Sequence, residues 1–371
     1  MKTKKIVSLL IAAMLAVTLI AGCTPPQQST PAQPATIHQE QPAPVTEPEP
    51  EPEAEPDTSV TITDVVGRTV TLLQPARRVV GTHNPTMNIP IVLGGGGIYI
   101  AGFGNKAMAI GLYDYVFPEL RDDVTQIGMG REINFESVLE VGADLAILPE
   151  RFADLADRFE EIGVPAAVII EVNQSFDSII TAVTLMGVLL GEEERAVQIN
   201  AFFSERIAVA AEIAEQVTDR PRAMFTSGSS ATSVAHASML QSVMMETAGA
   251  INVARDISAD DAFVEVSIEE IIGWNPEVIF IPAYASYTVE DILNDSAWSS
   301  IQAIQDGRVY IFPSHLDPWD FPTPSTAMGL AWLLNALHPE LYSMERVIQD
   351  ANEFYQLVYG QTFTAEQLGL Q

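Results

Sequence analysis

Cysteine and lysine are scarce in this sequence of 371 residues. The single cysteine, Cys23, excludes a disulfide framework and a cluster of thiolate metal ligands. After position 5 the only lysine is Lys106, and the formal net charge of the chain is −31. A chain this acidic is not expected to bind nucleic acid, and its charge favours a cationic partner surface instead.

Long apolar runs are also missing, except at the beginning of the chain. Three lysines among the first five residues precede an apolar run over 6–20, which is typical of an export signal and short for a membrane span. The residues LIAGC at 19–23 then resemble the bacterial lipobox, in which the signal is cut before a cysteine that becomes acylated. We expect a signal peptide over 1–22 and a lipid anchor on Cys23 that holds an extracytoplasmic protein at the cell membrane. An ordinary secretory signal with an incidental cysteine is the alternative.

The segment that follows is predicted to be a disordered tether over 23–58. It is rich in proline and glutamate, as in TEPEPEPEAEPD, and has almost no apolar residues with which to form a core. The remaining chain, 59–371, exceeds what one hydrophobic core usually supports, so we expect two lobes.

An internal repeat indicates the architecture of these lobes. The residues INFESVLEVGADLAILPE at 133–150 align without gaps to VSIEEIIGWNPEVIFIPA at 266–283. Each copy predicts a short helix, a turn and a buried strand that ends at a proline. Units of this kind favour an α/β fold in which mainly parallel sheets are flanked by helices. A chance similarity between two helix–turn–strand units is the alternative.

The predicted strands and one long helix set the boundaries. A glycine turn at Gly67 separates two strand-like runs at the start of the first lobe, 59–190. A run of helix formers over 191–219 predicts one helix that joins this lobe to the second, 220–371. Further strands are predicted at 78–80, 98–101, 143–148 and 166–170 in the first lobe and at 223–226, 278–281 and 309–312 in the second.

Several stretches together resemble one family. They are ITDVVGRTVTLLQPARRVV, DLAIL, NPEVIFI, ETAGAINVA and WSSIQAIQDGRVYIFP, in this order between about residues 59 and 360. The chain is similar here to the periplasmic-binding proteins for ferric siderophores, haem and cobalamin, whose two lobes are joined by a single long helix. The resemblance implies a monomeric solute receptor, with no cofactor of its own, that delivers a metal chelate to an ABC permease dimer with its ATPase.

The resemblance also implies a role for two acids. In the family, one acid on each lobe docks to arginines of the permease, and the matching residues are Glu136 and Glu269, which are equivalent in the repeat. A local role is the alternative, because Asn134 and Ser267 are predicted N-caps and acids favour the first turn of a helix.

Most candidate ligand-binding residues follow the predicted strands, where open α/β sheets bind their ligands. Lys106 and Phe263 are candidates because the resemblance implies a cleft residue at the first position and an aromatic against the ligand at the second. Arg151 is a weaker candidate, and His83, His236 and His315 are loop histidines that could ligate a metal. The candidate set is Lys106, Arg131, Ser229, Phe263, Tyr284, His315, Trp319 and Asp320.

The cargo stays open at this point. The resemblance favours a chelate of the siderophore, haem or cobalamin class. Glycine at position 130, where the family often has an aromatic, and the nearby Lys106 and Arg131 favour a smaller anionic cargo such as a nickel complex or a molybdate-type oxyanion. An extracytoplasmic enzyme on the same fold is the alternative from a different class, and it would need a base near Ser229 or a catalytic metal.

Overall fold

The computed structural model describes residues 58–257, 259, 263–313 and 316–370. The chain divides into two units, Met1–Glu55 and Pro56–Gln371, and all of the described residues belong to the second. The predicted signal peptide, Cys23 and most of the tether lie outside the described residues. None of the described helices combines the length and the apolar character that crossing a membrane requires.

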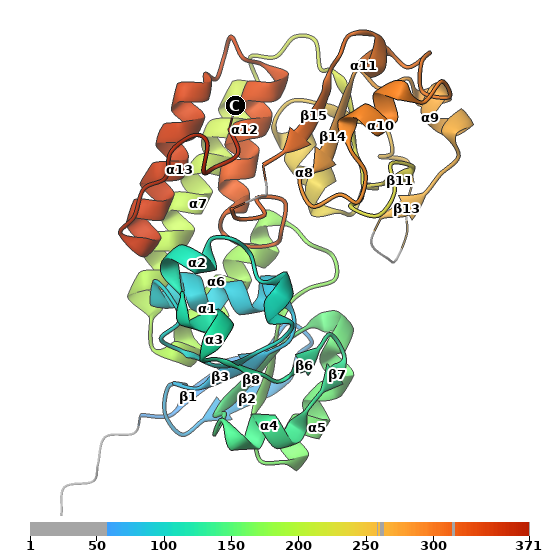
Figure 1. Ribbon diagram of the computed structural model, residues 1–371. Helices are drawn as coiled ribbons and strands as arrows, with labels where there is room; N and C mark the ends of the chain where they lie inside the picture. Colours follow the sequence, from blue (N-terminus) through green and yellow to red (C-terminus); the bar gives the residue numbers. More distant parts are fainter. Residues whose placement is uncertain (1–57, 258, 260–262, 314–315, 371) are drawn as a thin grey trace, which may run out of the picture. The chain divides into compact units, whose positions relative to one another are not determined.

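The fold is built on two separate parallel sheets (Figure 1). In the first, the strand order is β5-β4-β3-β8-β9, and in the second it is β12-β10-β14-β15. The first sheet consists of β3 (Val79–Gly81), β4 (Ile100–Phe103), β5 (Thr125–Gln126), β8 (Leu145–Pro149) and β9 (Ala166–Ile170). The second consists of β10 (Arg222–Phe225), β12 (Ile251–Asn252), β14 (Val278–Pro282) and β15 (Val309–Phe312).

Three antiparallel pairs accompany the sheets. They are β1 (Val60–Thr63) with β2 (Thr69–Leu72), β6 (Gly128–Met129) with β7 (Glu132–Ile133), and β11 (Ser233–Val234) with β13 (Val264–Glu265). The turn at Gly67 has φ 82°, which glycine adopts readily, so the predicted hairpin is confirmed.

The helices of the first half are α1 (Asn84–Gly94), α2 (Tyr113–Val116), α3 (Glu119–Asp122), α4 (Phe135–Glu140), α5 (Ala156–Glu161) and α6 (Phe176–Leu190), with the 3₁₀ helices η1 (Lys106–Met108) and η2 (Glu150–Leu155). After α7 (Glu193–Ala214) come α8 (Leu240–Thr247), α9 (Ile268–Trp274), α10 (Val289–Asn294), α11 (Gln302–Gln305), α12 (Thr326–Leu337) and α13 (Met344–Tyr359).

The α/β fold predicted from the sequence is confirmed, and the core shows why the strands form. Alternate residues of a strand point to opposite faces, and in β8 Leu145 and Ile147 join the main core while Ala146 and Leu148 join a second cluster. The strands of the second sheet divide in the same way between the main core and a third cluster. Both faces of each sheet are therefore buried, which is why the strands read as continuous apolar runs.

The repeat is present in the structure as two helix–turn–strand units, α4–β8 and α9–β14. A residue with left-handed backbone follows each helix, Gly142 with φ 58° two residues after α4 and Asn275 with φ 46° directly after α9. Directly before each strand, an acid accepts a backbone N–H from the start of the neighbouring strand. Asp144 accepts from Arg77 and Arg78, and Glu277 accepts from Arg222. The two copies therefore share their local geometry as well as their sequence pattern.

The helix predicted over 191–219 is shorter than expected. Gly191 adopts φ 69° and ends α6, so α7 begins only at Glu193, and it ends at Ala214. At 1.5 Å per residue it is about 33 Å long. It packs against α6, α12 and α13.

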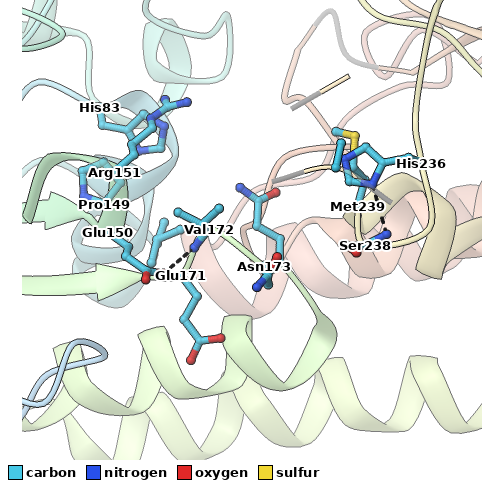
Figure 2. A pocket seen from close by; sticks show the side chains of 13 residues that line it. His83, Pro149, Glu150, Arg151, Glu171, Val172, Asn173, His236, Ser238 and Met239 are labelled. Atoms are coloured by element: carbon cyan, nitrogen blue, oxygen red, sulfur yellow. Dashed lines mark hydrogen bonds between the residues drawn. The ribbon is translucent and has the colours of Figure 1, made fainter. Parts of the chain in front are cut away.

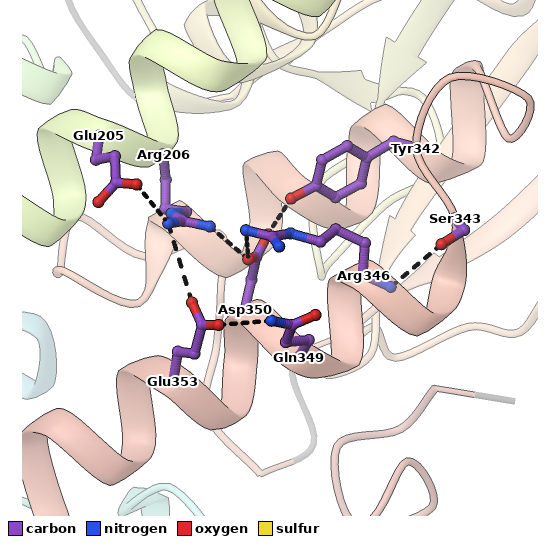
Figure 3. Close-up of polar contacts among 8 residues, drawn as sticks. All are labelled: Glu205, Arg206, Tyr342, Ser343, Arg346, Gln349, Asp350 and Glu353. Carbon is purple, nitrogen blue, oxygen red and sulfur yellow. Dashed lines mark hydrogen bonds and ion pairs between the residues drawn. The ribbon is translucent and has the colours of Figure 1, made fainter.

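A buried network of charged groups fixes α7 to α13 (Figure 3). Arg206 of α7 is 6% exposed and pairs with Asp350 of α13, which is fully buried. Arg346 lies 3.0 Å from the same carboxylate, and the hydroxyl of Tyr342 donates to it. Removing one partner of a buried ion pair leaves a buried charge uncompensated and strongly destabilises a fold. The contacts of Asp350 therefore hold α13 against α7.

Candidate functional site

Three adjacent strands of the first sheet end at a cavity. The residues after β3, β8 and β9 form one wall of a space of about 190 Å³, and residues after β11 contribute to another part of the lining. Open α/β sheets bind ligands beyond the carboxyl ends of their strands, so this is the expected place for a site. The lining residues are His83, Pro149, Glu150, Arg151, Ile170, Glu171, Val172, Asn173, Gln174, His236, Ser238, Met239 and Ala259.

Two histidines lie on opposite sides of the cavity in the view of Figure 2. His83 follows β3, and its Nδ1 lies 2.6 Å from the hydroxyl of Thr86. Burial, and secondly the charge of Arg151, lower the pKa of His83 to about 3, so its imidazole is neutral at neutral pH. His236 is 2% exposed, and its Nδ1 accepts a long hydrogen bond of 3.4 Å from the backbone N–H of Ser238.

Arg151 is the cation of this cavity wall. It is the second residue after β8, and its guanidinium lies 5.3 Å from the ring centroid of Phe152. Arg131 lies at the same distance from that ring and donates to the carbonyl oxygen of Arg151 at 2.7 Å. Cation–aromatic contacts of this kind limit the positions that a guanidinium can take, so Arg151 is held at the cavity wall.

The acids of the lining are Glu150 and Glu171. Glu150 accepts a hydrogen bond of 2.7 Å from the backbone N–H of Val172, which ties the loop after β9 to the end of β8. The described residues contain no group of three or more histidine, cysteine or acidic side chains arranged to hold a metal ion. The cavity therefore offers two imidazoles and one arginine, without a preformed cage for a bare ion.

Two helices begin at the cavity. His83 is the N-cap of α1 and Met239 is the N-cap of α8, and in the described structure neither side chain caps its helix with a hydrogen bond. The N-terminal end of a helix carries partial positive charge and binds anions. Together with Arg151, these two helix ends favour an anionic group in the cavity.

The residues predicted from the sequence lie elsewhere. Among the described residues of that set, none lines the cavity, and His315 lies outside the described residues. Lys106 donates to the carbonyl oxygens of Arg121 and Val124 at 2.7 and 2.8 Å, so its ammonium closes a loop. The side chain of Arg131 pairs with Asp154. Phe263 is half-buried and packs against the main core.

The other predicted residues gather around the end of the second sheet. Tyr284 donates to Asp320 at 2.6 Å, and Ser229 lies in the adjoining loop, where its hydroxyl is 3.1 Å from that of Ser227. Trp319 is 1% exposed and donates to the hydroxyl of Tyr355 at 2.8 Å. The structure thus brings Ser229, Tyr284 and Asp320 together, but in a polar cluster away from the cavity, in which Asp320 is buried while Ser229 and Tyr284 are exposed.

The predicted docking acids are exposed on the first turns of their helices. Glu136 lies on α4 and Glu269 on α9. The predicted caps are confirmed, because Asn134 accepts from the backbone N–H of Ser137 and Ser267 forms a capping box with its helix. The caps use Asn134 and Ser267, so these local bonds do not occupy Glu136 or Glu269.

Sequence reasoning gave too little weight to the residues directly after the strands. Arg151, His83 and His236 were secondary candidates, and Glu150 and Glu171 were missed although each immediately follows a buried strand. The repeat could have pointed to Arg151. It lies two residues after Pro149, as the predicted site residue Tyr284 lies two residues after the equivalent Pro282.

Comparison with known proteins identifies the family of the chain. The family model described as "Periplasmic binding protein" matches residues 92–316, more than half of the chain. The chain belongs to this family. A curated relative, the molybdate-binding protein MolA of Haemophilus influenzae, is 24% identical over 80% of this chain and 90% of that protein.

Solved structures share the fold at low identity. MolA bound to molybdate superposes with a TM-score of 0.72 at 24% identity, over 82% of this chain and 99% of that chain. A periplasmic solute binding protein of Veillonella parvula gives a TM-score of 0.72 at 22% identity, over 84% and 96% of the two chains. CeuE of Helicobacter pylori in a Ni-His complex gives 0.70 at 16% identity, over 84% and 98%.

Proposed function

We propose that the protein is the extracytoplasmic receptor of an ABC importer and that it binds a small oxyanion, of the molybdate class, in the cavity beyond β3, β8 and β9. The observation that carries this proposal is the small volume of the cavity combined with Arg151 and two helix N-termini in its wall, beside the acids Glu150 and Glu171. The family description and the named relatives support a binding protein that works in transport, and not an enzyme.

The volume of the cavity favours a small solute over the siderophore, haem and cobalamin chelates that the resemblance implied. Sites for drug-sized ligands occupy about 300–1,000 Å³. The cavity here has about 190 Å³, too little for a haem or a corrin in this structure. The smaller anionic cargo, which was the alternative from the sequence, therefore fits better than a ferric siderophore, haem or cobalamin.

Arg151 and two helix ends favour an anion in the cavity, against the opposing charges of Glu150 and Glu171. Arg151 supplies planar N–H donors that suit oxygen acceptors, and the ends of α1 and α8 add partial positive charge. A neutral His83 can donate or accept one further hydrogen bond without needing to be protonated. MolA, described as molybdate-binding, belongs to the same fold and supports this chemistry.

A small metal complex is the second candidate, and the two histidines favour it. Neutral imidazole is a common metal ligand, and His83 and His236 both line the cavity. A metal that arrives with part of its ligand set already bound would not need a third protein ligand. The Ni-His complex of CeuE makes nickel–histidine the appropriate test compound.

The experiment is a binding panel measured by calorimetry and native mass spectrometry. The panel contains molybdate, tungstate, sulfate, phosphate, nickel with histidine, haem and a ferric siderophore. We expect one oxyanion per protein, and about tenfold weaker binding in Arg151→Gln. Arg158→Gln is the matched control, because Arg158 also lies over an aromatic ring, Phe135, but does not line the cavity. Binding of haem or a siderophore without any oxyanion would exclude the proposed cargo.

The transport half of the proposal concerns the anchor and the permease. A lipid on Cys23 would hold the receptor beside a membrane permease, and Glu136 and Glu269 would pair with cations on it. Glu136→Arg combined with Glu269→Arg should leave oxyanion affinity unchanged and stop uptake in cells. Normal uptake by this double variant would contradict the docking role.

A further inference from the structure

The two copies of the repeat expose an apolar side chain at the same position. Leu139 of α4 is 53% exposed and its equivalent on α9, Ile272, is 38% exposed. The preceding residue is fully buried in both copies, Val138 in one and Ile271 in the other. A single exposed leucine on a protein surface is ordinary. Here an exposed apolar residue recurs at equivalent positions of the two copies, each time after a fully buried one.

Each apolar side chain stands beside exposed acids. Residues three apart on a helix share a face, which places Leu139 next to Glu136 and Ile272 next to Glu269. A second pair of equivalent acids, Glu132 and Glu265, is also exposed, on the strands that precede the two helices. Each copy thus presents an apolar side chain next to acidic residues.

The equivalence extends to the sheets that support these helices. The order β4-β3-β8-β9 in the first sheet corresponds to β12-β10-β14-β15 in the second, with β8 and β14 at matching places. Because α4 leads into β8 and α9 leads into β14, Leu139 and Ile272 are equivalent in topology as well as in sequence.

We propose that Leu139 and Ile272 are apolar anchors with which this protein binds a membrane permease built from two equivalent subunits. Each anchor enters an apolar pocket whose rim carries arginine or lysine. Two equivalent patches on one chain match a partner that presents the same surface twice. Apolar anchors at the centre of an interface supply most of its binding energy, while charged groups at the rim set orientation and encounter rate.

The charge of the surroundings argues for this occupant over others. A second copy of this chain, with its net charge of −31, would bring acids against acids. An anionic lipid surface would be repelled in the same way. A partner with a basic rim satisfies both the acids and the apolar residue of each copy.

The inference rests on the proposed function, so the experiment measures docking and cargo binding separately. The full chain is titrated against the permease of the proposed importer, held with its ATPase in nanodiscs. Leu139→Ser and Ile272→Ser should each weaken docking about tenfold, and the double variant about a hundredfold, with oxyanion affinity unchanged. Val197→Ser is the matched control, because Val197 is 68% exposed on α7, outside the repeat, and should leave docking unchanged.

The outcomes separate the two proposals. Docking of the double variant as tight as that of the natural chain, or an equal loss in Val197→Ser, overturns the apolar anchors alone. A natural chain that binds its oxyanion but not the permease overturns the proposed partner and the anchors with it. A second measurement does not depend on affinity. In a Cys23→Ser background, a fluorophore on Leu139→Cys or Ile272→Cys should shift to the blue on docking, and one on Val197→Cys should not.

Discussion

The loops after β8 and β14 begin at equivalent positions of the repeat, and their side chains enter different surroundings. Arg151, after β8, lines the cavity. Its equivalent, Tyr284, donates to the buried carboxylate of Asp320 and lies against Gly228, where an added Cβ would be 2.8 Å from the ring. The repeat preserves the frame of helix and strand, while the residue just beyond each strand lines the cavity in one copy and bonds to a buried acid in the other.

The acidic residues near the ends of the two sheets also differ in their surroundings. Glu150 and Glu171 line the cavity of the first half. Asp317 and Asp320 of the second half are 4% and 1% exposed and lie among hydroxyl and indole groups. Burial raises the pKa of Asp317 to about 7 and that of Asp320 to about 6. We therefore expect the first half to control affinity and the second half to control stability and its dependence on pH.

The largest expected effect comes from reversing the charge in the first half. Arg151→Glu should weaken oxyanion binding about a hundredfold at low salt, because it replaces the cation of the cavity wall by a third acid. The loss should shrink as salt is added, since Arg151 is exposed to solvent and screened. Calorimetry at two salt concentrations measures both effects. Unchanged affinity would show that the cavity is not the binding site.

A smaller effect, on the free energy of unfolding, should follow from neutralising the buried Asp317 of the second half. Below about pH 4, Asp317 is protonated in the folded and the unfolded chain. As the pH rises from about 4 to 7 the unfolded chain releases this proton first, so the stabilisation due to the raised pKa of Asp317 is lost through that window. Asp317→Asn cannot titrate and should be more stable than the natural chain by about 1–2 kcal/mol at pH 8, with no advantage at pH 4.

Urea unfolding from pH 4 to pH 8 tests this prediction, and Asp350→Asn is its control. Burial raises the pKa of Asp350 too, but its carboxylate pairs with Arg206, which is 6% exposed. Neutralising Asp350 leaves that guanidinium buried without this partner and should destabilise the fold at pH 8. An advantage of Asp317→Asn that is equal at pH 4 and pH 8 would show that Asp317 does not titrate in this window.

The comparison also shows why the fold was easier to predict than the site. The inner strands of both sheets follow from apolar runs, whereas the two-residue edge strands β5 and β12 carry no such run and were not predicted. The N-caps Asn134 and Ser267 follow from local hydrogen bonding. The direction of a side chain after a strand depends on distant contacts instead. Lys106 donates to the carbonyl oxygen of Arg121 in α3, and Trp319 donates to the hydroxyl of Tyr355 in α13. Neither partner can be identified from the local sequence.

Tyr284→Phe is the smallest of these changes, and it separates the sequence-based site from the structural one. Tyr284 is 45% exposed, as a ligand-binding residue could be, but its hydroxyl donates to the buried carboxylate of Asp320. If the structure gives its role, oxyanion affinity stays unchanged and the free energy of unfolding falls by about 1 kcal/mol, because a buried carboxyl loses a hydrogen bond. The pKa of Asp320, already raised to about 6 by burial, should rise further, since the lost hydroxyl was lowering it. Calorimetric titration and urea unfolding of the same sample give both quantities, and weaker binding with unchanged stability would return Tyr284 to the binding site.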